Sequence, residues 1–227
     1  MHFGSVNLSI IICKALGKGD IREQGSKNAG TTNTLRVLGV GPAIAVITWD
    51  ILKGTIAVWL ARLVAMLGEG FYPEQFNEVW TYGIMLASIG AVLGHNYPVY
   101  FGFRGGKGVA TSLGIILAIE WKIGLACLAL GLAGIAFTQM VSVGSLLAAL
   151  LYPILVFIMG GTFDTHFSAT KTIHCIYIAF SIVLTLSVYI RHRANIKRIY
   201  EGTENKLSFK KKVDENNEEK KEEKEEN

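Results

Sequence analysis

Charged residues are scarce in this chain, and their scarcity argues against a soluble fold. Only 18% of its 227 residues are charged, whereas 51% are hydrophobic, and the mean hydropathy is +0.38. Acidic residues are rarest before the C-terminal tail: residues 1–207 hold 16 basic and 10 acidic side chains, and residues 208–227 hold six Lys and eight acidic residues. Apolar blocks separated by short basic loops are typical of an integral membrane protein.

Cysteine is also rare, and its positions argue against a metal or disulfide site. Cys13, Cys127 and Cys175 lie in apolar segments, and no pair has the CxxC spacing. We therefore interpret them as small buried hydrophobic residues. We expect no cleavable signal peptide, because no basic residues precede the first apolar segment and no small-x-small site follows it.

The apolar residues are grouped in segments long enough to suggest membrane-spanning helices, each of which needs roughly 17–25 mainly apolar residues. The seven segments are about 3–16, 41–67, 80–95, 109–120, 123–137, 143–160 and 172–190. The fourth and fifth are short and are separated only by Trp121 and Lys122, so they form either a tight helical hairpin or one broken helix. We expect an all-α integral membrane fold with seven transmembrane helices, within a range of five to seven.

The distribution of cations predicts the orientation in the membrane. Cations occur in loops 17–40 and 96–108 and after the last apolar segment, whereas loop 68–79 has three Glu and no cation. By the positive-inside rule, the N-terminus should lie outside, and the basic loops and the C-terminus in the cytoplasm. This arrangement requires an odd number of spans, which seven satisfies.

The last 20 residues differ from the rest in composition. Residues 208–227 mix charges of both signs and lack apolar periodicity. We expect a disordered, charged cytoplasmic tail, which leaves residues 1–207 as the membrane-embedded domain.

Glycines and cations cluster in residues 104–108, Arg-Gly-Gly-Lys-Gly, directly before the apolar segment that begins at Val109. Glycines let backbone N–H groups approach an anion, Arg104 and Lys107 supply charge, and a helix starting at Val109 adds a favourable dipole. The pattern suggests a phosphate cradle. It is not a Walker A loop, because the glycine spacing is one residue short and no strand precedes it. The alternative is a flexible turn with cations that follow the positive-inside rule.

Two further loops carry groups that suit phosphate recognition. Residues 20–39 concentrate hydroxyl and amide side chains and end with Arg36, although an ordinary polar loop is the alternative. In residues 189–207, His192 and Asn195 are three apart, so a continuing helix would place them on one face. There the alternative is a juxtamembrane helix with an incidental His. Three such loops on one membrane face suit two phosphorylated substrates better than one.

The order and spacing of these motifs resemble those of the bacterial acyl-phosphate:glycerol-3-phosphate acyltransferases, the PlsY family. The matching stretches are Gly25–Asn33 with Leu35-Arg36, then Gly94–Pro98 with Phe103–Thr111, then His192–Ile196 through Glu204. The resemblance implies a seven-helix inner-membrane acyltransferase over residues 1–207. It would acylate the first hydroxyl of sn-glycerol 3-phosphate from acyl phosphate, giving lysophosphatidic acid and phosphate.

The resemblance also implies what the protein binds. Its partners would be the two substrates and membrane lipids, with a functional link to the enzyme that makes acyl phosphate. It would use no cofactor, metal or nucleic acid. The sequence departs from the family at Lys27, where Gly is usual, and at Ala194, where an acidic residue is frequent. The family usually has further residues before its equivalent of Gly4-Ser5, so we expect Met1 to be a misassigned or truncated start.

The resemblance and the residue chemistry together predict the site. The expected catalytic residues, which would bind phosphoryl oxygens, are Ser26, Arg36, Lys107, His192 and Asn195. The expected substrate-binding and supporting residues are Asn28, Thr32, Asn33, Arg104, Gly105, Gly106, Gly108 and Glu204. The general base stays open between His192 and a substrate phosphate, with a covalent intermediate on Ser26 as a third route. The H-x-x-x-x-D dyad of acyltransferases that use acyl-CoA is absent.

Asp50 and Lys53 are three residues apart inside the second apolar segment. Ionisable residues within a membrane span are a functional hypothesis by default, and mutual pairing is the simpler interpretation, which we prefer.

Two other functions fit the composition. A transporter or channel for an organic phosphate would use the basic loops as a vestibule, but it should show inverted internal repeats, and none is found. A structural lipid-binding protein would not need Ser26, Arg36, Lys107 and His192 together.

Overall fold

The computed structural model describes residues 1–68, 76–159 and 171–207, and within these residues it contains helices and no strands. The α-helices are α1 (Leu8–Ala15), α2 (Thr31–Leu38), α3 (Val40–Gly68), α4 (Phe76–Asn96), α5 (Val109–Ile119), α6 (Trp121–Thr138), α7 (Val141–Met159), α8 (Lys171–Arg191) and α9 (Arg193–Tyr200). Short 3-10 helices are η1 (Phe3–Ser5), η2 (Ile21–Glu23) and η3 (Val99–Phe101). The tail predicted to be disordered, residues 208–227, lies outside the described residues, as do most of the loops 68–79 and 161–171.

A helix occupies each of the seven expected apolar segments, which confirms the all-α prediction. Among the described residues, four helices are long and apolar enough to cross a membrane: α3, α6, α7 and the 172–191 part of α8. α5 is a shorter apolar helix of 11 residues. Gly124 in α6 packs directly against Leu117 in α5, so the two helices form a tight hairpin rather than one broken helix.

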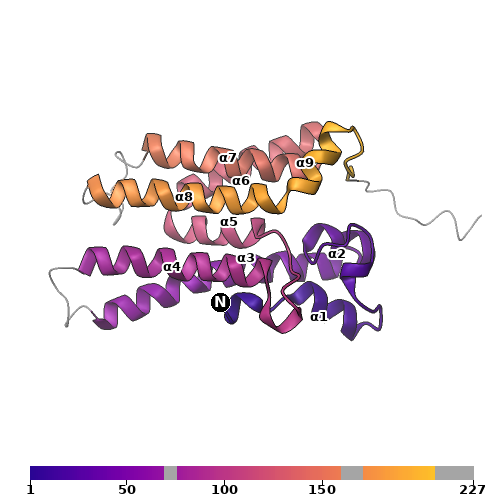
Figure 1. Ribbon diagram of the computed structural model, residues 1–227, viewed down its shortest axis with the longest axis horizontal. Helices are drawn as coiled ribbons and strands as arrows, with labels where there is room; N and C mark the ends of the chain where they lie inside the picture. Colours follow the sequence, from indigo (N-terminus) through magenta and orange to yellow (C-terminus); the bar gives the residue numbers. More distant parts are fainter. Residues whose placement is uncertain (69–75, 160–170, 208–227) are drawn as a thin grey trace, which may run out of the picture.

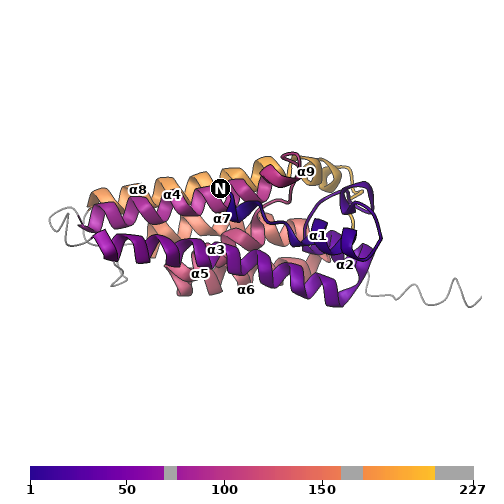
Figure 2. The same ribbon diagram turned by 90° about the horizontal axis from the view of Figure 1, so that it is seen from below.

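The helices form two groups joined by α5 (Figure 1, Figure 2). α1, α3 and α4 lie in one group, and α6, α7 and α8 lie in the other. α5 lies between them and packs on both α3 and α6. α2, α9 and the segment 97–108 gather at one end of this bundle.

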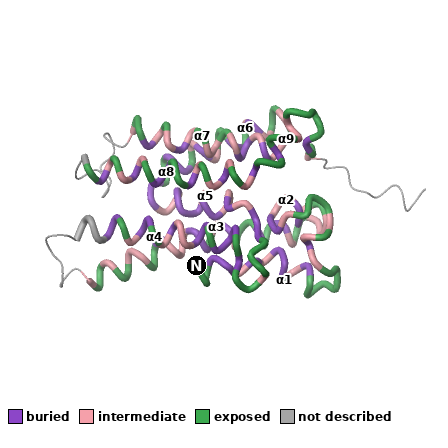
Figure 3. The backbone as a smooth tube through the Cα atoms, in the orientation of Figure 1, coloured by how far each residue is buried: buried purple, intermediate pink, exposed green. Residues whose placement is uncertain are grey.

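Apolar side chains fill the interior and also cover the outside. Figure 3 shows α5 buried along most of its length, whereas the outer helices alternate between buried and exposed positions. Ile115 of α5 and Val156 of α7 are fully buried in the same cluster. On the outer faces, Leu86, Phe137 and Phe157 are 70%, 90% and 70% exposed. Such faces are stable when they contact lipid rather than water.

Glycine allows the backbones of α3 and α5 to approach closely. A Cβ placed on Gly114 would lie 2.1 Å from the carbonyl oxygen of Ile51, and one on Gly54 would lie 2.2 Å from that of Thr111. The Thr55 hydroxyl donates to the Gly114 carbonyl at 3.0 Å. This packing through small residues sets the position of α5, which begins directly after residues 104–108, called the glycine loop below.

We expect Gly114→Ala to destabilise the protein, because the new methyl group meets backbone rather than a movable side chain. Overpacking of this kind costs about 1–3 kcal/mol, which lowers the thermal unfolding temperature of the detergent-purified protein. Gly83→Ala is the matched control, since a Cβ there meets nothing within 4 Å. Equal unfolding temperatures for both variants would contradict the close helix contact.

Candidate active site

A cavity of about 430 Å³ opens at the end of the bundle where α2, α9 and the glycine loop gather. Its polar part is lined by side chains that include Ser26, Asn28, Thr31, Thr32, Arg36, Lys107, Arg191, His192, Asn195, Arg198 and Glu204. Its apolar part is lined by residues that include Leu113, Ile116, Cys127, Leu128, Leu132, Ile135, Ala148, Tyr152 and Leu184. All three motif regions therefore meet at one cavity, and the cavity is amphipathic.

The Asn33 side chain holds the first loop in place through hydrogen bonds to its backbone. Its Oδ1 accepts the Ser26 backbone N–H at 2.7 Å, and its Nδ2 donates to the carbonyls of Ile21 and Gln24, both at 3.0 Å. Asn33 is fully buried and is not among the residues that line the cavity. Its structural role is to place Ser26, and a direct contact with substrate has no support in this geometry.

Lys27 adopts a backbone conformation that favours glycine. Its φ is +59°, in the left-handed region, where residues other than Gly, Asn and Asp are disfavoured. This conformation gives a physical reason for the glycine usual at this position in the family that the sequence resembles. Lys27 adds an exposed cation to the cavity lining.

Two helix N-termini open on the cavity. Gly30, Thr31 and Thr32 at the start of α2 line it, as do Gly108 and Val109 at the start of α5. Both N-cap residues are glycines, so no side chain caps either helix. Free N–H groups and the helix dipole favour an anion at each terminus. The expected helix start at Val109 is confirmed.

A chain of polar contacts joins the second and third motifs. The Lys107 ammonium donates to Asn195 Oδ1, and Asn195 Nδ2 donates to Glu204 Oε1 at 2.7 Å. Glu204 also accepts from the Ser142 hydroxyl at 2.9 Å and from Arg198 Nε at 2.8 Å. Burial raises the pKa of Glu204, but these hydrogen bonds outweigh it and hold the pKa below its usual range. The anionic Glu204 thus orients Asn195 and Arg198, which line the cavity.

His192 lies at the junction of α8 and α9. We expected one continuous helix through His192 and Asn195, but α8 ends at Arg191 and α9 begins at Arg193. Both residues nevertheless line the cavity. The His192 Nδ1 lies 2.8 Å from the Val188 carbonyl, which can only accept, so Nδ1 carries the proton and Nε2 carries the lone pair. Burial and the nearby Lys107 lower the pKa of His192 to about 4, which keeps it neutral at pH 7.

The glycine loop is held by Arg191. Its guanidinium donates to the carbonyls of Gly106, at 2.8 and 3.1 Å, and of Gly105, at 3.3 Å. Arg104 points elsewhere: it is exposed, it is not among the lining residues, and its carbonyl accepts from Arg22 at 3.1 Å. The cation that contacts the loop is therefore Arg191, the neighbour of His192 in the sequence, which was not among the predicted site residues.

Most of the predicted site residues are brought together. The residues that line the cavity are Ser26, Asn28, Thr32, Arg36, Lys107, Gly108, His192, Asn195 and Glu204, and those that do not are Asn33, Arg104, Gly105 and Gly106. Within the described parts of the chain, the Arg36 guanidinium has no hydrogen-bond partner, and burial lowers its pKa without neutralising it. It is free to bind an anion.

The predicted Asp50–Lys53 pair is confirmed, and it has a third member. Lys53 Nζ lies 2.6 Å from Asp50 Oδ1 and 2.6 Å from His95 Nδ1, and Asp50 Oδ1 lies 3.3 Å from His95 Nδ1. All three side chains are buried, and Asp50 and His95 line the cavity. Sequence spacing connects Asp50 to Lys53 but gives no signal for His95, which lies on another helix.

These features define an integral membrane protein of several helices with an amphipathic, cationic cavity at the end of the bundle. The family model described as glycerol-3-phosphate acyltransferase matches residues 2–202. The glycerol-3-phosphate acyltransferase of Halalkalibacterium halodurans is 42% identical over 210 residues, covering 92% of this chain and 93% of that protein. That of Shouchella clausii is 45% identical over 207 residues, covering 91% and 92%.

Solved structures agree with these relatives. The crystal structure of PlsY (YgiH), an integral membrane glycerol 3-phosphate acyltransferase, in its glycerol 3-phosphate form is similar with a TM-score of 0.71 at 28% identity, over 91% of each chain. Its lysophosphatidic acid form gives a TM-score of 0.69. This chain belongs to the glycerol-3-phosphate acyltransferase family, which confirms the resemblance of its motifs.

We expect anion binding in the cavity to weaken as the pH is raised through about 8. Burial lowers the pKa of Lys107 to about 8, with Glu204 opposing and Arg198, Arg191 and Arg36 adding to the shift. Above that pH the ammonium loses its proton, and affinity for sulfate, which keeps its charge, should fall by up to about tenfold per pH unit. Calorimetric titration with sulfate measures this.

Lys107→Arg is the matched variant, because a guanidinium stays charged throughout this range. Its sulfate affinity should lose the pH dependence. The same fall with pH in both proteins would show that another group is responsible.

Proposed function

We propose that this protein transfers an acyl group from acyl phosphate to the sn-1 hydroxyl of glycerol 3-phosphate, giving 1-acyl-glycerol 3-phosphate and phosphate. One observation carries the proposal: a single cavity joins a cluster of cations and helix N-termini to an apolar channel between helices. An acyl phosphate has this distribution of charge and apolar surface, and glycerol 3-phosphate supplies a second anion for the polar end. The names of the family and its relatives support the acceptor and the acyl transfer.

The polar end has separate groups for two phosphoryl groups. Arg36 and the start of α2 form one part of the lining, and Lys107 with the start of α5 forms another. We assign one phosphate to each, with Ser26 and Asn28 donating to the first. His192 and Asn195 lie on the third motif and complete the polar lining.

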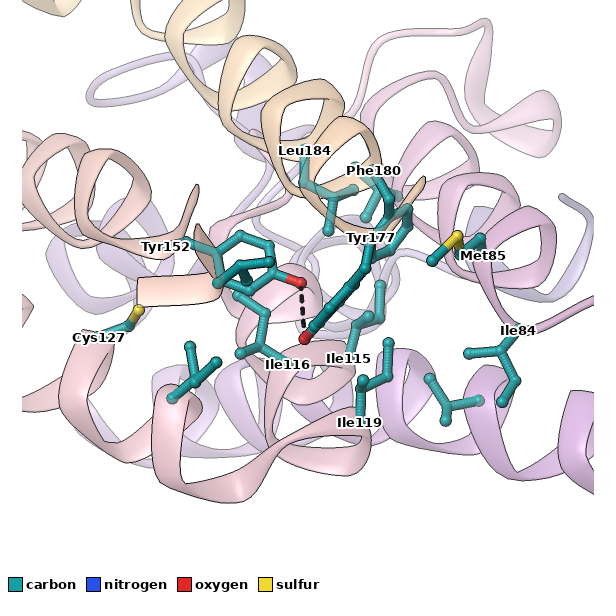
Figure 4. Packing of buried hydrophobic residues seen from close by; sticks show 14 of the residues in the cluster. Ile84, Met85, Ile115, Ile116, Ile119, Cys127, Tyr152, Tyr177, Phe180 and Leu184 are labelled. Atoms are coloured by element: carbon teal, nitrogen blue, oxygen red, sulfur yellow. Dashed lines mark hydrogen bonds between the residues drawn. The ribbon is translucent and has the colours of Figure 1, made fainter. Parts of the chain in front are cut away.

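The apolar end suits the acyl chain. Lining residues on α7 recur on one face, from Ser142 to Tyr152, and span about 15 Å at 1.5 Å per residue. On α6 the lining residues run from Cys127 to Ile135. Ile135 lies against Gly144 of α7, and Gly131 lies against Ala148, so α6 runs antiparallel to α7 along the same channel. Tyr152 is the last lining residue of α7, and its hydroxyl donates to that of Tyr177 at 3.4 Å (Figure 4). We place the end of the acyl chain at Tyr152.

The chemistry needs little beyond positioning, because phosphate is already a good leaving group. The sn-1 hydroxyl oxygen attacks the carbonyl carbon, the new C–O bond forms, and the bond from the carbonyl carbon to the phosphate oxygen breaks. Holding both anions in one site makes this attack effectively unimolecular. Lys107 and the α5 N-terminus stabilise the negative charge that moves onto the departing phosphate.

The hydroxyl proton goes to the phosphate of the donor. With a pKa of about 4, His192 is a weaker base than a phosphate group, whose second pKa is about 6. His192 instead accepts a hydrogen bond from the hydroxyl at Nε2 and directs the nucleophile. A covalent route through Ser26 has no support, since among the described residues no base is hydrogen-bonded to its hydroxyl.

We further propose that the cavity faces the cytoplasm of a bacterial inner membrane, with the N-terminus outside. The basic loops that predict this orientation are the same ones that gather at the cavity end of the bundle (Figure 1). Acyl phosphate would be delivered on that side by the enzyme that makes it.

The direct test is phosphate release by purified protein given acyl phosphate and glycerol 3-phosphate. Lys107→Ala and Arg36→Ala should each lower kcat/KM by about 100-fold, because each removes a preorganised charge from the transition state. Lys18→Ala is the matched control, since Lys18 is an exposed cation outside the cavity lining. Substrate binding without phosphate release in the unmodified protein would favour a transporter instead.

Tyr152→Ala should extend the preferred acyl chain. Removing the ring deepens the channel, and each further buried methylene contributes about 0.8 kcal/mol, or about fourfold in kcat/KM. The measurement is kcat/KM across a series of acyl phosphates of increasing length. Tyr152→Phe keeps the ring and should keep the original preference. An unchanged profile in Tyr152→Ala would place the acyl chain elsewhere.

A further inference from the structure

The buried cluster of Asp50, Lys53 and His95 has no part in the reaction described above, yet it is costly to maintain. The three side chains are 3%, 0% and 3% exposed. Taking ionised groups out of water into an apolar bundle is unfavourable even when they are paired. The position of the cluster, next to the cavity and beneath the glycine loop, indicates what it does.

The cluster fixes the orientation of the His95 ring. Lys53 Nζ donates to Asp50 Oδ1 at 2.6 Å and lies 2.6 Å from His95 Nδ1. Asp50 Oδ1 lies 3.3 Å from the same ring nitrogen. Two residues of a neighbouring helix therefore hold the imidazole through one of its nitrogens.

The glycine loop rests directly on His95. The Gly106 N–H donates to the His95 carbonyl at 3.2 Å, and the Gly105 N–H donates to that of Asn96 at 3.2 Å. A Cβ on Gly106 would lie 2.1 Å from His95 Nε2, and one on Gly105 would lie 2.1 Å from the His95 carbonyl oxygen. The space that two side chains would occupy is therefore filled by His95.

Lys107 follows immediately, and its ammonium reaches across to Asn195. The loop is held on one side by Arg191, which donates to both glycine carbonyls, and on the other by the imidazole. The contacts thus run from Asp50 and Lys53 through His95 to Lys107.

We propose that Asp50 and Lys53 are positioning residues for the acyl transfer: they lock His95 as the support of the Gly105–Gly106 turn, and so set Lys107 in the anion site. The proposal rests on the proposed function, because it names what places one of its phosphate-binding groups. It assigns the cluster a role in binding and catalysis that is separable from stability.

The separation is possible because a buried ion pair can be replaced as a unit. Removing one partner leaves an unpaired charge and destabilises a protein, whereas removing both is often neutral or stabilising. The double variant Asp50→Asn with Lys53→Met removes both charges and keeps similar volumes. His95→Gln is the companion variant, since it removes the ring on which Gly106 rests.

The experiment measures kcat, KM for glycerol 3-phosphate and thermal unfolding temperature for the full chain in detergent. We expect at least a tenfold rise in KM, with lower kcat, in both variants at an unfolding temperature close to that of the unmodified protein. A folded double variant with unchanged kcat and KM overturns the proposal. No turnover by the unmodified protein would instead overturn the proposed function, so the two failures are distinct.

Gly106→Ala changes the glycine instead of the residues that hold His95, and so tests the same Gly106–His95 contact. It tests the proposal if the double variant does not fold. Its methyl group must displace the imidazole, so we expect a KM rise of similar size. Gly41→Ala is the matched control, because a Cβ there meets nothing within 4 Å. Unchanged kinetics in Gly106→Ala overturn the proposal. When Gly106→Ala is combined with the double variant, the two losses should not add, and full additivity would also overturn it.

Discussion

The rest of this structure depends on one constraint: charged side chains must be held in place at the boundary of an apolar helix bundle. The cavity gathers cations from distant segments, and several of them are held by fixed partners. Glu204 supplies the compensating charge, and through Asn195 it reaches Lys107. Because desolvation makes every such contact stronger and every unpaired charge more costly, these residues form a hydrogen-bonded network around Glu204, and Arg36 beside it is left to bind an anion.

Glycine serves this constraint in two different ways. At Gly54 and Gly114 it lets the backbones of α3 and α5 touch, which fixes the helix that presents the second motif. At Gly105 and Gly106 it leaves room for His95 beneath the loop. Neither role requires the glycines to touch a substrate. The glycine loop is therefore a packed and supported element, and the groups that we propose to bind phosphate are its Lys107 and the helix N-terminus that follows.

The amphipathic cavity explains why a membrane bundle suits this chemistry. Its polar end lies where α2, α9 and the glycine loop gather, and its apolar end reaches Tyr152 within the helical core. A molecule with an anionic head and an acyl tail matches both ends at once. In the reaction that we propose, the protein holds the reacting groups together and excludes water from the apolar part, so positioning supplies most of the rate enhancement.

The sequence by itself determined the helical segments, the motif regions that meet at the cavity, and nine of the thirteen predicted residues that line it, because hydropathy and donor chemistry are local properties. Tertiary structure decided the rest. Only folding shows that Asn33 faces inward beneath Ser26, that Arg191 rather than Arg104 holds the glycine loop, and that His95 joins Asp50 and Lys53. Each of these depends on which face of one helix meets another, and that is set by packing between segments far apart in the chain.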